Sequence, residues 1–380
     1  MTGDMAKVKI VNVVGARPNF MKIAPIYERM LTEPIIDPYL IHTGQHYDRA
    51  MSELFFQQLG LPEPHRYLGV GSGDHGEQTG KIMIDFERAV KDIQPQLVIV
   101  VGDVNSTIAC GLVAVKLGVK LANVEAGLRS YDRTMPEEVN RVLTDQISDY
   151  LFTTERSALE NLRREGIDER KVFFVGNVMI DSLRQHQDKA AGRDILERLQ
   201  ITPRDFVLVT LHRPSNVDDA DMLKGLLDAL SELSRRVPVV FPVHPRSHKK
   251  IQEFGLGDLV AGNPGLRLID PMGYLDFLNC MSNAGVVITD SGGIQEETTV
   301  LGVPCITVRD NTERPVTTTE GTNVVVGRDP KAMLGEAFAA LDGRGKSGAL
   351  PELWDGNASQ RIVDILVKIL SGNEKGVERA

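Results

Sequence analysis

The stretch GVVITDSGGIQEE at residues 285–297 joins an apolar run, a glycine turn and the start of a helical pattern. Its first part, Gly285–Thr289, has the continuous apolar character of a strand that is buried on both faces of a parallel sheet. The same character marks six further runs, at Val8–Val14, Leu97–Val101, Lys120–Val124, Phe206–Leu211, Val239–Val243 and Pro304–Val308. The sequence therefore predicts parallel sheets.

Apolar residues at helical spacing separate these runs. Ile82, Phe86 and Val90 form one such pattern, and the segments Met222–Leu233 and Ile362–Leu370 form two more. Strands that alternate with helices are typical of an α/β fold with doubly wound parallel sheets. The 380-residue chain is long enough for two or three domains, and its polar segment Asp181–Arg204 separates two blocks of similar size. We expect the domain boundary in that segment.

The composition excludes several classes of function. Lysine and arginine total 43 and aspartate and glutamate total 52, so the formal net charge is −9, which argues against general nucleic-acid binding. No apolar run approaches the roughly 18 residues of a membrane span. Met1–Lys9 lacks the pattern of a signal peptide, so we expect a cytoplasmic protein with no membrane association. Cys110, Cys280 and Cys305 lie far apart, and no cysteine or histidine spacing predicts a metal site.

The glycine turn carries the sharpest signal for phosphate binding. Gly292 and Gly293 allow the backbone to approach a ligand closely, the Ser291 hydroxyl can donate a hydrogen bond, and the start of a helix presents free N–H groups. The alternative is an ordinary turn in which Ser291 caps the helix. The carboxylate of Glu297 in the helix that follows favours a nucleotide, because it can accept hydrogen bonds from ribose hydroxyls.

Basic residues lie near the first strand and downstream of the glycine turn. Arg17 and Lys22 belong to the segment GARPNFMK, where a Rossmann fold holds phosphate, and Arg314 can add positive charge to a nucleotide site. The segment lacks the GxGxxG spacing, which disfavours classical dinucleotide binding. The alternative for Arg17 and Lys22 is a solvated basic loop, with Pro18 at the start of a helix.

Three acids in the first half are candidates for proton transfer. Asp103 and Glu125 directly follow apolar strands, and Glu137 lies in a polar segment. A carboxylate beside so much apolar sequence is costly unless it is paired, and such sites often have a shifted pKa. The structural alternatives are an N-cap for Asp103 and an ion pair with Arg141 for Glu137. Because the three loops are expected at one sheet edge, the acids together indicate a catalytic cluster.

Two histidines end predicted strands in the second half. An imidazole at the position of His212 or His244 can transfer a proton or hold a phosphate. In open parallel sheets, ligands bind beyond the carboxyl ends of the strands. We therefore expect these histidines, the glycine turn and the acids to lie across an interdomain cleft.

Four motifs occur in a fixed order over nearly the whole chain. They are GARP at residues 15–18, VEAGLRS at 124–130, PEEVNR at 136–141 and DSGGIQEE at 290–297. In this order they resemble the non-hydrolysing UDP-N-acetylglucosamine 2-epimerases. The resemblance implies a GT-B-like fold of two Rossmann-like domains facing an interdomain cleft, a homodimer, and no need for a metal ion or a nicotinamide cofactor.

The resemblance also implies a domain order. We expect an N-terminal Rossmann-like domain with the acids at residues 1–182 and a linker at 183–204. A C-terminal Rossmann-like domain that binds UDP is expected at residues 205–355. A C-terminal helix and tail at residues 356–380 are expected to pack back on the first domain.

The implied reaction interconverts UDP-GlcNAc and UDP-ManNAc, for the synthesis of surface-polysaccharide precursors. UDP leaves by anti elimination to give a 2-acetamidoglucal, and it adds again with a proton on the other face of C2. A single base cannot easily reach both faces, which explains the presence of several acids. By motif, the catalytic residues are Asp103, Glu125, Glu137, His212 and Arg141. His212 is expected near the leaving phosphate, and Arg141 is expected to orient Glu137. The implied contacts to the UDP-sugar are Arg17, Lys22, His212, Met272, Phe277, Ser291, Gly292, Gly293, Glu297 and Arg314.

The chain departs from the allosterically activated bacterial members of that family. Those members bind a second UDP-GlcNAc through a Gln-His-Arg-Gln stretch, an arginine in the next loop and a His-Met-Asn-Pro segment. Here the corresponding positions read Gln45-His46-Tyr47-Asp48, Glu77 and His244-Pro245-Arg246-Ser247. The second glutamine and the loop arginine are absent, so we expect no activation by UDP-GlcNAc of that kind.

Other functions are compatible with the sequence. The segment Arg129–Met135 resembles epimerases of UDP-diacetamido-uronic acids, in which Arg133 would pair with the C6 carboxylate; the alternative for Arg133 is a solvated loop charge. A GT-B glycosyltransferase would share the UDP half but would need an acceptor site. A hydrolysing epimerase would release free ManNAc, and a sensor would bind the nucleotide sugar without turnover.

Overall fold

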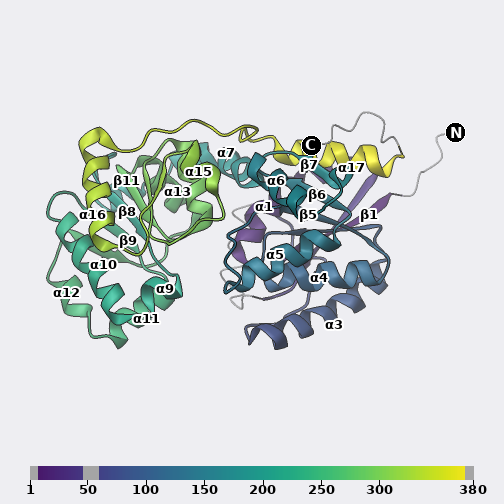
Figure 1. The fold of residues 1–380 in the computed structure, drawn as a ribbon, viewed down its shortest axis with the longest axis horizontal. Coiled ribbons are helices and arrows are strands. Elements are labelled where there is room, and N and C mark those ends of the chain that lie inside the picture. Colours follow the sequence, from purple (N-terminus) through teal and green to yellow (C-terminus); the bar gives the residue numbers. More distant parts are fainter. Residues whose placement is uncertain (1–6, 46–59, 373–380) are drawn as a thin grey trace. The chain divides into compact units, whose positions relative to one another are not determined.

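The computed structural model describes residues 7–45 and 60–372, apart from the side chain of Arg17. Two compact units divide the chain (Figure 1). The first unit contains Met1–Ser182 and Glu352–Ala380, and the second contains Leu183–Pro351. Each unit is built on its own parallel sheet.

Seven parallel strands form the sheet of the first unit, in the order β3-β2-β1-β4-β5-β6-β7. The strands are β1 (Val8–Val14), β2 (Ile36–His42), β3 (Arg66–Tyr67), β4 (Leu97–Val101), β5 (Lys120–Ala126), β6 (Tyr150–Thr153) and β7 (Val172–Phe174). From β1 the chain adds β2 and β3 on one side, and it then adds β4 to β7 on the other side of β1. This doubly wound order creates a switch point between β1 and β4, where the carboxyl ends open to ligands.

Helices cover the sheet of the first unit (Figure 1). Side chains of β1 and β4 pack with those of α3 (His75–Ile93) and α4 (Asn105–Lys116) in one core, and α5 (Pro136–Ile147) lies beside α4. Away from these helices, α1 (Arg17–Leu31) packs against α17 (Ala358–Leu370). Because both faces are covered, the strands are apolar along their whole length, as the sequence predicts.

The last segment of the chain belongs to the first unit through specific contacts. Trp354 is fully buried, and its Nε1 donates to the Thr154 carbonyl oxygen at 2.9 Å. The first backbone N–H groups of α17, from Ala358 and Ser359, donate to the Asp181 carboxylate at 3.1 and 2.6 Å. These bonds satisfy donors that a helix N-terminus otherwise leaves unpaired.

Six parallel strands form the sheet of the second unit, in the order β10-β9-β8-β11-β12-β13. The strands are β8 (Val207–Thr210), β9 (Val239–Pro242), β10 (Leu266–Ile269), β11 (Val286–Thr289), β12 (Cys305–Thr307) and β13 (Asn323–Val325). This order repeats that of the first unit, with the switch point between β8 and β11. The two sequence blocks of similar size thus correspond to two sheets of the same type.

The faces of this second sheet pack against two different sets of helices. One core joins the sheet to α10 (Ala220–Leu233), α11 (Pro245–Glu253) and α16 (Pro330–Ala339). The other joins it to α7 (Val178–Ala191), α8 (Ile195–Arg198) and α13 (Tyr274–Asn283). The remaining short elements of the two units are α6 (Arg156–Arg164), η1 (Glu169–Lys171), α9 (Pro214–Val217), α12 (Gly257–Ala261), α14 (Gly292–Leu301), α15 (Pro315–Thr319) and η2 (Ala340–Arg344).

The predicted fold class, two doubly wound parallel sheets, is confirmed, and the predicted linker is corrected. Residues 183–204 are part of the second unit, because Leu183, Ala190, Ile195 and Ile201 are buried in its core. Polar residues that suggested a linker, such as Gln185 and Asp188 of α7 and Arg193 between α7 and α8, are exposed. Residues 352–355, expected in the second domain, belong to the first unit. Within the described ranges, no helix has the length and apolar character needed to cross a membrane.

The close approach of Gly176 to Leu353 allows a test of how residues 352–372 pack on the first unit. Gly176 has φ +87, and an added Cβ would lie 2.1 Å from the Leu353 carbonyl oxygen. We expect Gly176→Ala to lower the free energy of unfolding by about 2–5 kcal/mol, from left-handed strain plus overpacking. The emission of Trp354, which is the one tryptophan of the sequence, should shift to the red in the folded variant.

Gly166→Ala is the matched control, because Gly166 has φ +77 with nothing within 4 Å of the added Cβ. It should cost only the left-handed strain, about 1–2 kcal/mol, with unchanged emission. Urea unfolding followed by tryptophan fluorescence measures both variants. Equal losses with equal emission spectra would contradict the docking contact.

Candidate active site

Near the carboxyl ends of β4 and β5, Lys22 of α1 lies against Glu125 of β5 in the first unit. Gly102, directly after β4, has φ +72, a conformation that glycine adopts at little cost. A Cβ built on Gly102 would lie 3.6 Å from Lys22 Nζ and 3.7 Å from Glu125 Oε2. The turn after β4 therefore lies directly against the Lys22–Glu125 pair.

Glu125 has an uncommon backbone conformation near the end of β5. Its φ is 67°, and the pairing of β5 with β6 shifts register between Val124 and Ala126. Such a conformation costs a non-glycine residue on the order of 1–3 kcal/mol and persists where the surrounding contacts fix it. The Glu125 carboxylate also forms a buried ion pair with Lys22 of α1. Backbone strain and a buried charge pair at one residue are typical of a functional site.

Asp145 of α5 holds the backbone on both sides of Glu125. It is fully buried, and its Oδ1 accepts from Asn123 Nδ2 at 2.8 Å. Its Oδ2 accepts from the Gly127 N–H at 3.0 Å and lies 2.7 Å from Arg129 Nη2. Burial raises the pKa of Asp145 above its usual range, although Arg129 and the other donors oppose that rise. These contacts fix the residues two before and two after Glu125.

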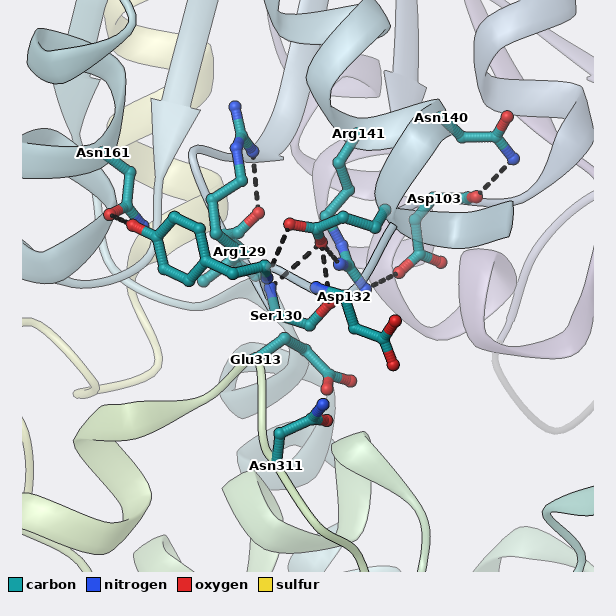
Figure 2. A network of polar contacts seen from close by, with 12 residues as sticks. Asp103, Arg129, Ser130, Asp132, Asn140, Arg141, Asn161, Asn311 and Glu313 are labelled. Atoms are coloured by element: carbon teal, nitrogen blue, oxygen red, sulfur yellow. Dashed lines mark hydrogen bonds and ion pairs between the residues drawn. The ribbon is translucent and has the colours of Figure 1, made fainter. Parts of the chain in front are cut away.

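Arg141 of α5 contacts two acids, Asp103 after β4 and Glu138 in the first turn of α5 (Figure 2). Its Nη2 donates to Asp103 Oδ2 at 2.8 Å, and its Nη1 forms an ion pair with Glu138. Asn140 Nδ2 donates to the Asp103 backbone oxygen at 2.9 Å. We expected Arg141 to orient Glu137, but its guanidinium instead contacts Asp103 and Glu138. A guanidinium that is itself buried gains most from a carboxylate that is also removed from water, and Glu138 is such a group.

Glu137 and Glu138 have different surroundings in the first turn of α5. Glu138 is buried and accepts from the Ser130 N–H at 3.0 Å and the Tyr131 N–H at 2.9 Å. Glu137 is half-buried. The neighbouring acid Glu138 thus holds the loop after β5, and Glu137 presents the more accessible carboxylate.

The glycine turn opens α14 in the second unit. Ser291 is the N-cap, Gly292 and Gly293 are the first helical residues, and the Ser291 N–H donates to Thr289 Oγ1 at 3.0 Å. A Cβ on Gly292 would lie 2.7 Å from Glu313 Oε1, so a larger residue at this position would have to displace the Glu313 carboxylate. The free N–H groups and the dipole at the start of the helix are suited to a phosphate.

Glu297, one of the expected nucleotide contacts, is buried beside Tyr274. The Tyr274 hydroxyl donates to Glu297 Oε1 at 3.1 Å. Burial raises the pKa of Glu297 to about 8; the Tyr274 hydrogen bond opposes this rise and the charge of Glu296 adds to it. At neutral pH the Glu297 carboxyl is therefore mostly protonated, so it can both donate and accept a hydrogen bond.

Other expected nucleotide contacts surround the same helix. Arg314 is buried and forms an ion pair with Glu296, the acid next to Glu297. Met272 and Phe277 are partly buried against the core of the second unit. The structure therefore places Arg314, Met272, Phe277 and Glu297 around α13 and α14, and α14 begins at the glycine turn.

His212 directly follows the Leu211 that ends the predicted strand, and its Nδ1 lies 2.8 Å from Asp290 Oδ1. Asp290 begins the glycine turn, so His212 and the turn lie together at the switch point of the second sheet. Among the basic residues, Lys22 lies with Glu125 in the first unit. The side chain of Arg17 lies outside the described part of the structure.

Sequence reasoning assigned no role to four residues that hold this site, three of them buried and one, Tyr274, partly buried. Glu138, Asp145 and Asp290 hold loops, and Tyr274 contacts Glu297. Two of them had a usable signal, because Glu138 and Asp145 lie three residues before and four residues after Arg141, on one helix face. Tyr274 had none, and Asp290 had only its place as the first residue of the motif DSGGIQEE.

A family model described as UDP-N-acetylglucosamine 2-epimerase matches residues 28–367 of the chain. The UDP-N-acetylglucosamine 2-epimerase of Methanocaldococcus jannaschii is 43 % identical over 364 residues, which cover 94 % of this chain and 99 % of that protein. A crystal structure of the M. jannaschii enzyme in complex with UDP-GlcNAc and UDP is 42 % identical and has a TM-score of 0.87, covering 95 % and 99 % of the two chains.

A relative with a different printed substrate is also similar. The UDP-2,3-diacetamido-2,3-dideoxy-D-glucuronate 2-epimerase of Pseudomonas aeruginosa is 39 % identical over 372 residues, which cover 95 % of this chain and all of that protein.

The raised pKa of Glu297 generates a prediction about stability. Because the carboxyl titrates near pH 4.5 when unfolded and near 8 when folded, the folded state holds the proton more tightly, and stability is lost as pH rises through this window. Glu297→Gln removes the titration and keeps an acceptor for Tyr274. Between pH 4.5 and 8, the unfolding free energy of the wild type should fall more steeply with pH than that of the variant. We expect the two slopes to differ by up to about 1.4 kcal/mol per pH unit.

Urea unfolding at intervals from pH 5 to 9 measures this slope. Glu232→Gln makes the same chemical change at an exposed glutamate of the same unit and should follow the wild type. If Glu297→Gln follows the wild type as well, Glu297 is ionised in the folded state and the assignment fails.

Proposed function

The chain belongs to the UDP-N-acetylglucosamine 2-epimerase family, and we propose that it is the non-hydrolysing enzyme that interconverts UDP-GlcNAc and UDP-ManNAc. The observation that carries this proposal is the pair of acid clusters in the first unit. Glu125, near the end of β5, pairs with Lys22 of α1, and Asp103, two residues after the neighbouring strand β4, pairs with Arg141 of α5. A protein that only binds a nucleotide sugar has no need for a buried carboxylate in a strained backbone conformation, such as Glu125, close to a second acid.

The chemistry of C2 sets what these acids must do. No carbonyl group adjoins C2 in the sugar ring, so a carbanion there has no stabilisation. Cleavage of the bond between C1 and the phosphate oxygen must therefore lead, with its electron pair leaving on UDP. One carboxylate then takes the C2 proton to complete the 2-acetamidoglucal, and a second returns a proton to the other face before UDP adds again. Asp103, Glu125 and Glu137 are our candidates for these two tasks.

The second unit supplies the groups that suit the departing UDP. Ser291, Gly292 and Gly293 at the start of α14 would hold the diphosphate, with His212 beside it. The protonated Glu297 would donate to one ribose hydroxyl and accept from the other. Arg17, Lys22, Met272, Phe277 and Arg314 are the further contacts that we carry over by motif.

Three further parts of the proposal rest on the sequence and its resemblance to the family. We propose a homodimer, a cytoplasmic location and a role in supplying precursors of surface polysaccharides. No metal ion or cofactor enters the proposed reaction, because the acids, the leaving diphosphate and water account for every proton and electron pair.

Incubation with UDP-GlcNAc in deuterium oxide tests the proposal. We expect UDP-ManNAc with deuterium at C2, because the proton that leaves exchanges with solvent before another returns. NMR of the sugar follows the product. Free ManNAc would identify a hydrolysing enzyme, and turnover of the UDP-diacetamido-uronate alone would assign the substrate of the P. aeruginosa relative. Binding of both nucleotides without turnover would indicate a sensor or a transferase.

Glu125→Gln tests the role of the acid within the same assay. The amide keeps the shape and a hydrogen bond to Lys22 but cannot take a proton. We expect kcat to fall by roughly 10²–10⁴-fold with UDP affinity nearly unchanged. Glu352→Gln, which breaks an exposed ion pair with Arg156 in the same unit, is the control and should retain full activity. Unchanged turnover in Glu125→Gln would remove Glu125 from the mechanism.

We also propose that UDP-GlcNAc does not activate this enzyme at a second site. Gln45 Oε1 accepts from the Ser106 N–H at 3.0 Å and from its hydroxyl at 2.7 Å, so this amide already has partners within the first unit. Glu77 pairs with Lys81, and residues 46–48 lie outside the described ranges. We expect hyperbolic kinetics from the UDP-ManNAc side. A sigmoidal curve that trace UDP-GlcNAc relieves would contradict this proposal.

A further inference from the structure

We propose that Asp290 is a positioning residue that fixes the tautomer and orientation of His212. Asp290 lies between β11 and the N-cap of α14, and His212 follows the neighbouring strand β8. The proposal rests on the proposed function for one point, the place of His212 beside the leaving diphosphate. The dyad itself is a property of the free protein.

Asp290 is fully buried and receives four donors. Its Oδ1 lies 2.8 Å from His212 Nδ1. Its Oδ2 accepts from the N–H groups of His212 and Arg213 at 2.9 and 2.8 Å and from Asn216 Nδ2 at 3.1 Å. An ionised carboxylate accepts hydrogen bonds and donates none, so the proton in the bond to the ring belongs to Nδ1.

The charge state of Asp290 agrees with this assignment. Burial raises the pKa of Asp290, but the hydrogen bonds from His212 and Arg213 outweigh it, and the pKa of this carboxyl lies below its usual 3.8. Asp290 is therefore ionised at neutral pH. A buried carboxylate that keeps its charge requires donors in fixed places, and the loop after β8 provides them.

The consequence for His212 is a single available ring nitrogen. With Nδ1–H held by Asp290, the neutral ring carries its lone pair on Nε2. The His212 side chain is 38 % exposed although its Nδ1 edge is tied to a fully buried group. Protonation of Nε2 then produces an imidazolium that can donate to an oxygen of the departing diphosphate, and the proton returns to solvent or substrate when UDP adds again.

His244 lies beside His212, and its ring proton is on the other nitrogen. The two rings have centroids 5.4 Å apart and are tilted by 41°. His244 Nδ1 accepts from the Arg246 N–H at 3.2 Å, so in a neutral His244 the proton is on Nε2. Of these two rings, His212 is therefore the one whose Nδ1 proton is fixed by a carboxylate.

Asp290→Asn distinguishes positioning of the ring from holding of the loop. The donors from Arg213 and Asn216 point at Oδ2, and the His212 N–H lies closer to Oδ2, at 2.9 Å, than to Oδ1, at 3.2 Å. The amide oxygen therefore takes the place of Oδ2, and the NH₂ group faces the His212 ring. Because this NH₂ group would then donate to Nδ1, the ring must accept there and move its proton to Nε2. The shape of the residue is preserved, but the lone pair of His212 is turned to the wrong nitrogen.

Long-range ¹H–¹⁵N NMR of the free, labelled protein reads the tautomer directly. His212→Asn assigns the signal among the eight histidines of the sequence. We expect Nδ1–H in the wild type and Nε2–H in Asp290→Asn. An Nε2–H tautomer in the wild type overturns the proposal even if the Asp290 variant fails to fold, and so does an unchanged tautomer in a folded variant.

A double-mutant cycle in the epimerase assay tests whether Asp290 acts through His212. We expect Asp290→Asn to lower kcat by roughly 100-fold or more with UDP affinity within about threefold, and to change kcat little further when His212 is already asparagine. An equal loss in both backgrounds would show that Asp290 only holds the loop and would overturn the proposal. Asn216→Ala removes one loop donor that does not touch the ring, and it should lower stability with the tautomer unchanged.

The two proposals fail in different ways. A wild-type protein that does not epimerise UDP-GlcNAc in deuterium oxide refutes the proposed function before any variant is compared. The tautomer of His212 is measured without substrate, so its outcome decides the dyad in either case.

Discussion

Helices cover both faces of each sheet, and this burial restricts where polar chemistry can occur. A strand that is apolar along its whole length can present a charged group only where it ends. Glu125, Gly102 and Asp290 stand at or directly beyond such ends, and each lies against a polar or charged partner. The doubly wound order then brings the ends of β4 and β5, and of β8 and β11, to one edge of each sheet. The sites in both units follow from this one constraint.

Backbone geometry at these ends depends on buried charges that have no part in the proposed chemistry. Glu125 keeps its left-handed conformation while Asp145 holds the residues around it, and Arg129 neutralises Asp145. Arg129 is itself held by Glu165 at 2.6 Å. A buried carboxylate of this kind is costly to desolvate, so its value lies in fixing one loop conformation rather than in net stability. The motif VEAGLRS thus contains Glu125, a candidate for proton transfer, and Arg129, which neutralises the acid that holds the backbone around Glu125.

Two buried acids near the start of α14 differ in charge, because Asp290 is ionised and Glu297 is mostly protonated. Asp290 meets four donors, and the pKa of its carboxyl falls below the usual range. Glu297 meets one tyrosine hydroxyl and a neighbouring carboxylate, and its pKa rises to about 8. The ionised acid is suited to orienting an imidazole, and the neutral acid is suited to binding a diol. The number of donors around each carboxyl makes the difference.

The sequence by itself determined the fold class, the central strands and the family. The runs Val8–Val14 and Leu97–Val101 coincide with β1 and β4, because buried parallel strands are continuous apolar segments. It missed short strands such as β7 and placed a linker over α7 and α8, because three or four residues carry little periodicity and a polar outer face resembles a loop. Only the tertiary structure decided the partners, namely Arg141 with Asp103 and Glu138, Asp145 around Glu125, and His212 on Asp290. Arg141 and Asp103 lie 38 positions apart and His212 and Asp290 lie 78 apart, so these pairs form only because the fold brings the residues within reach.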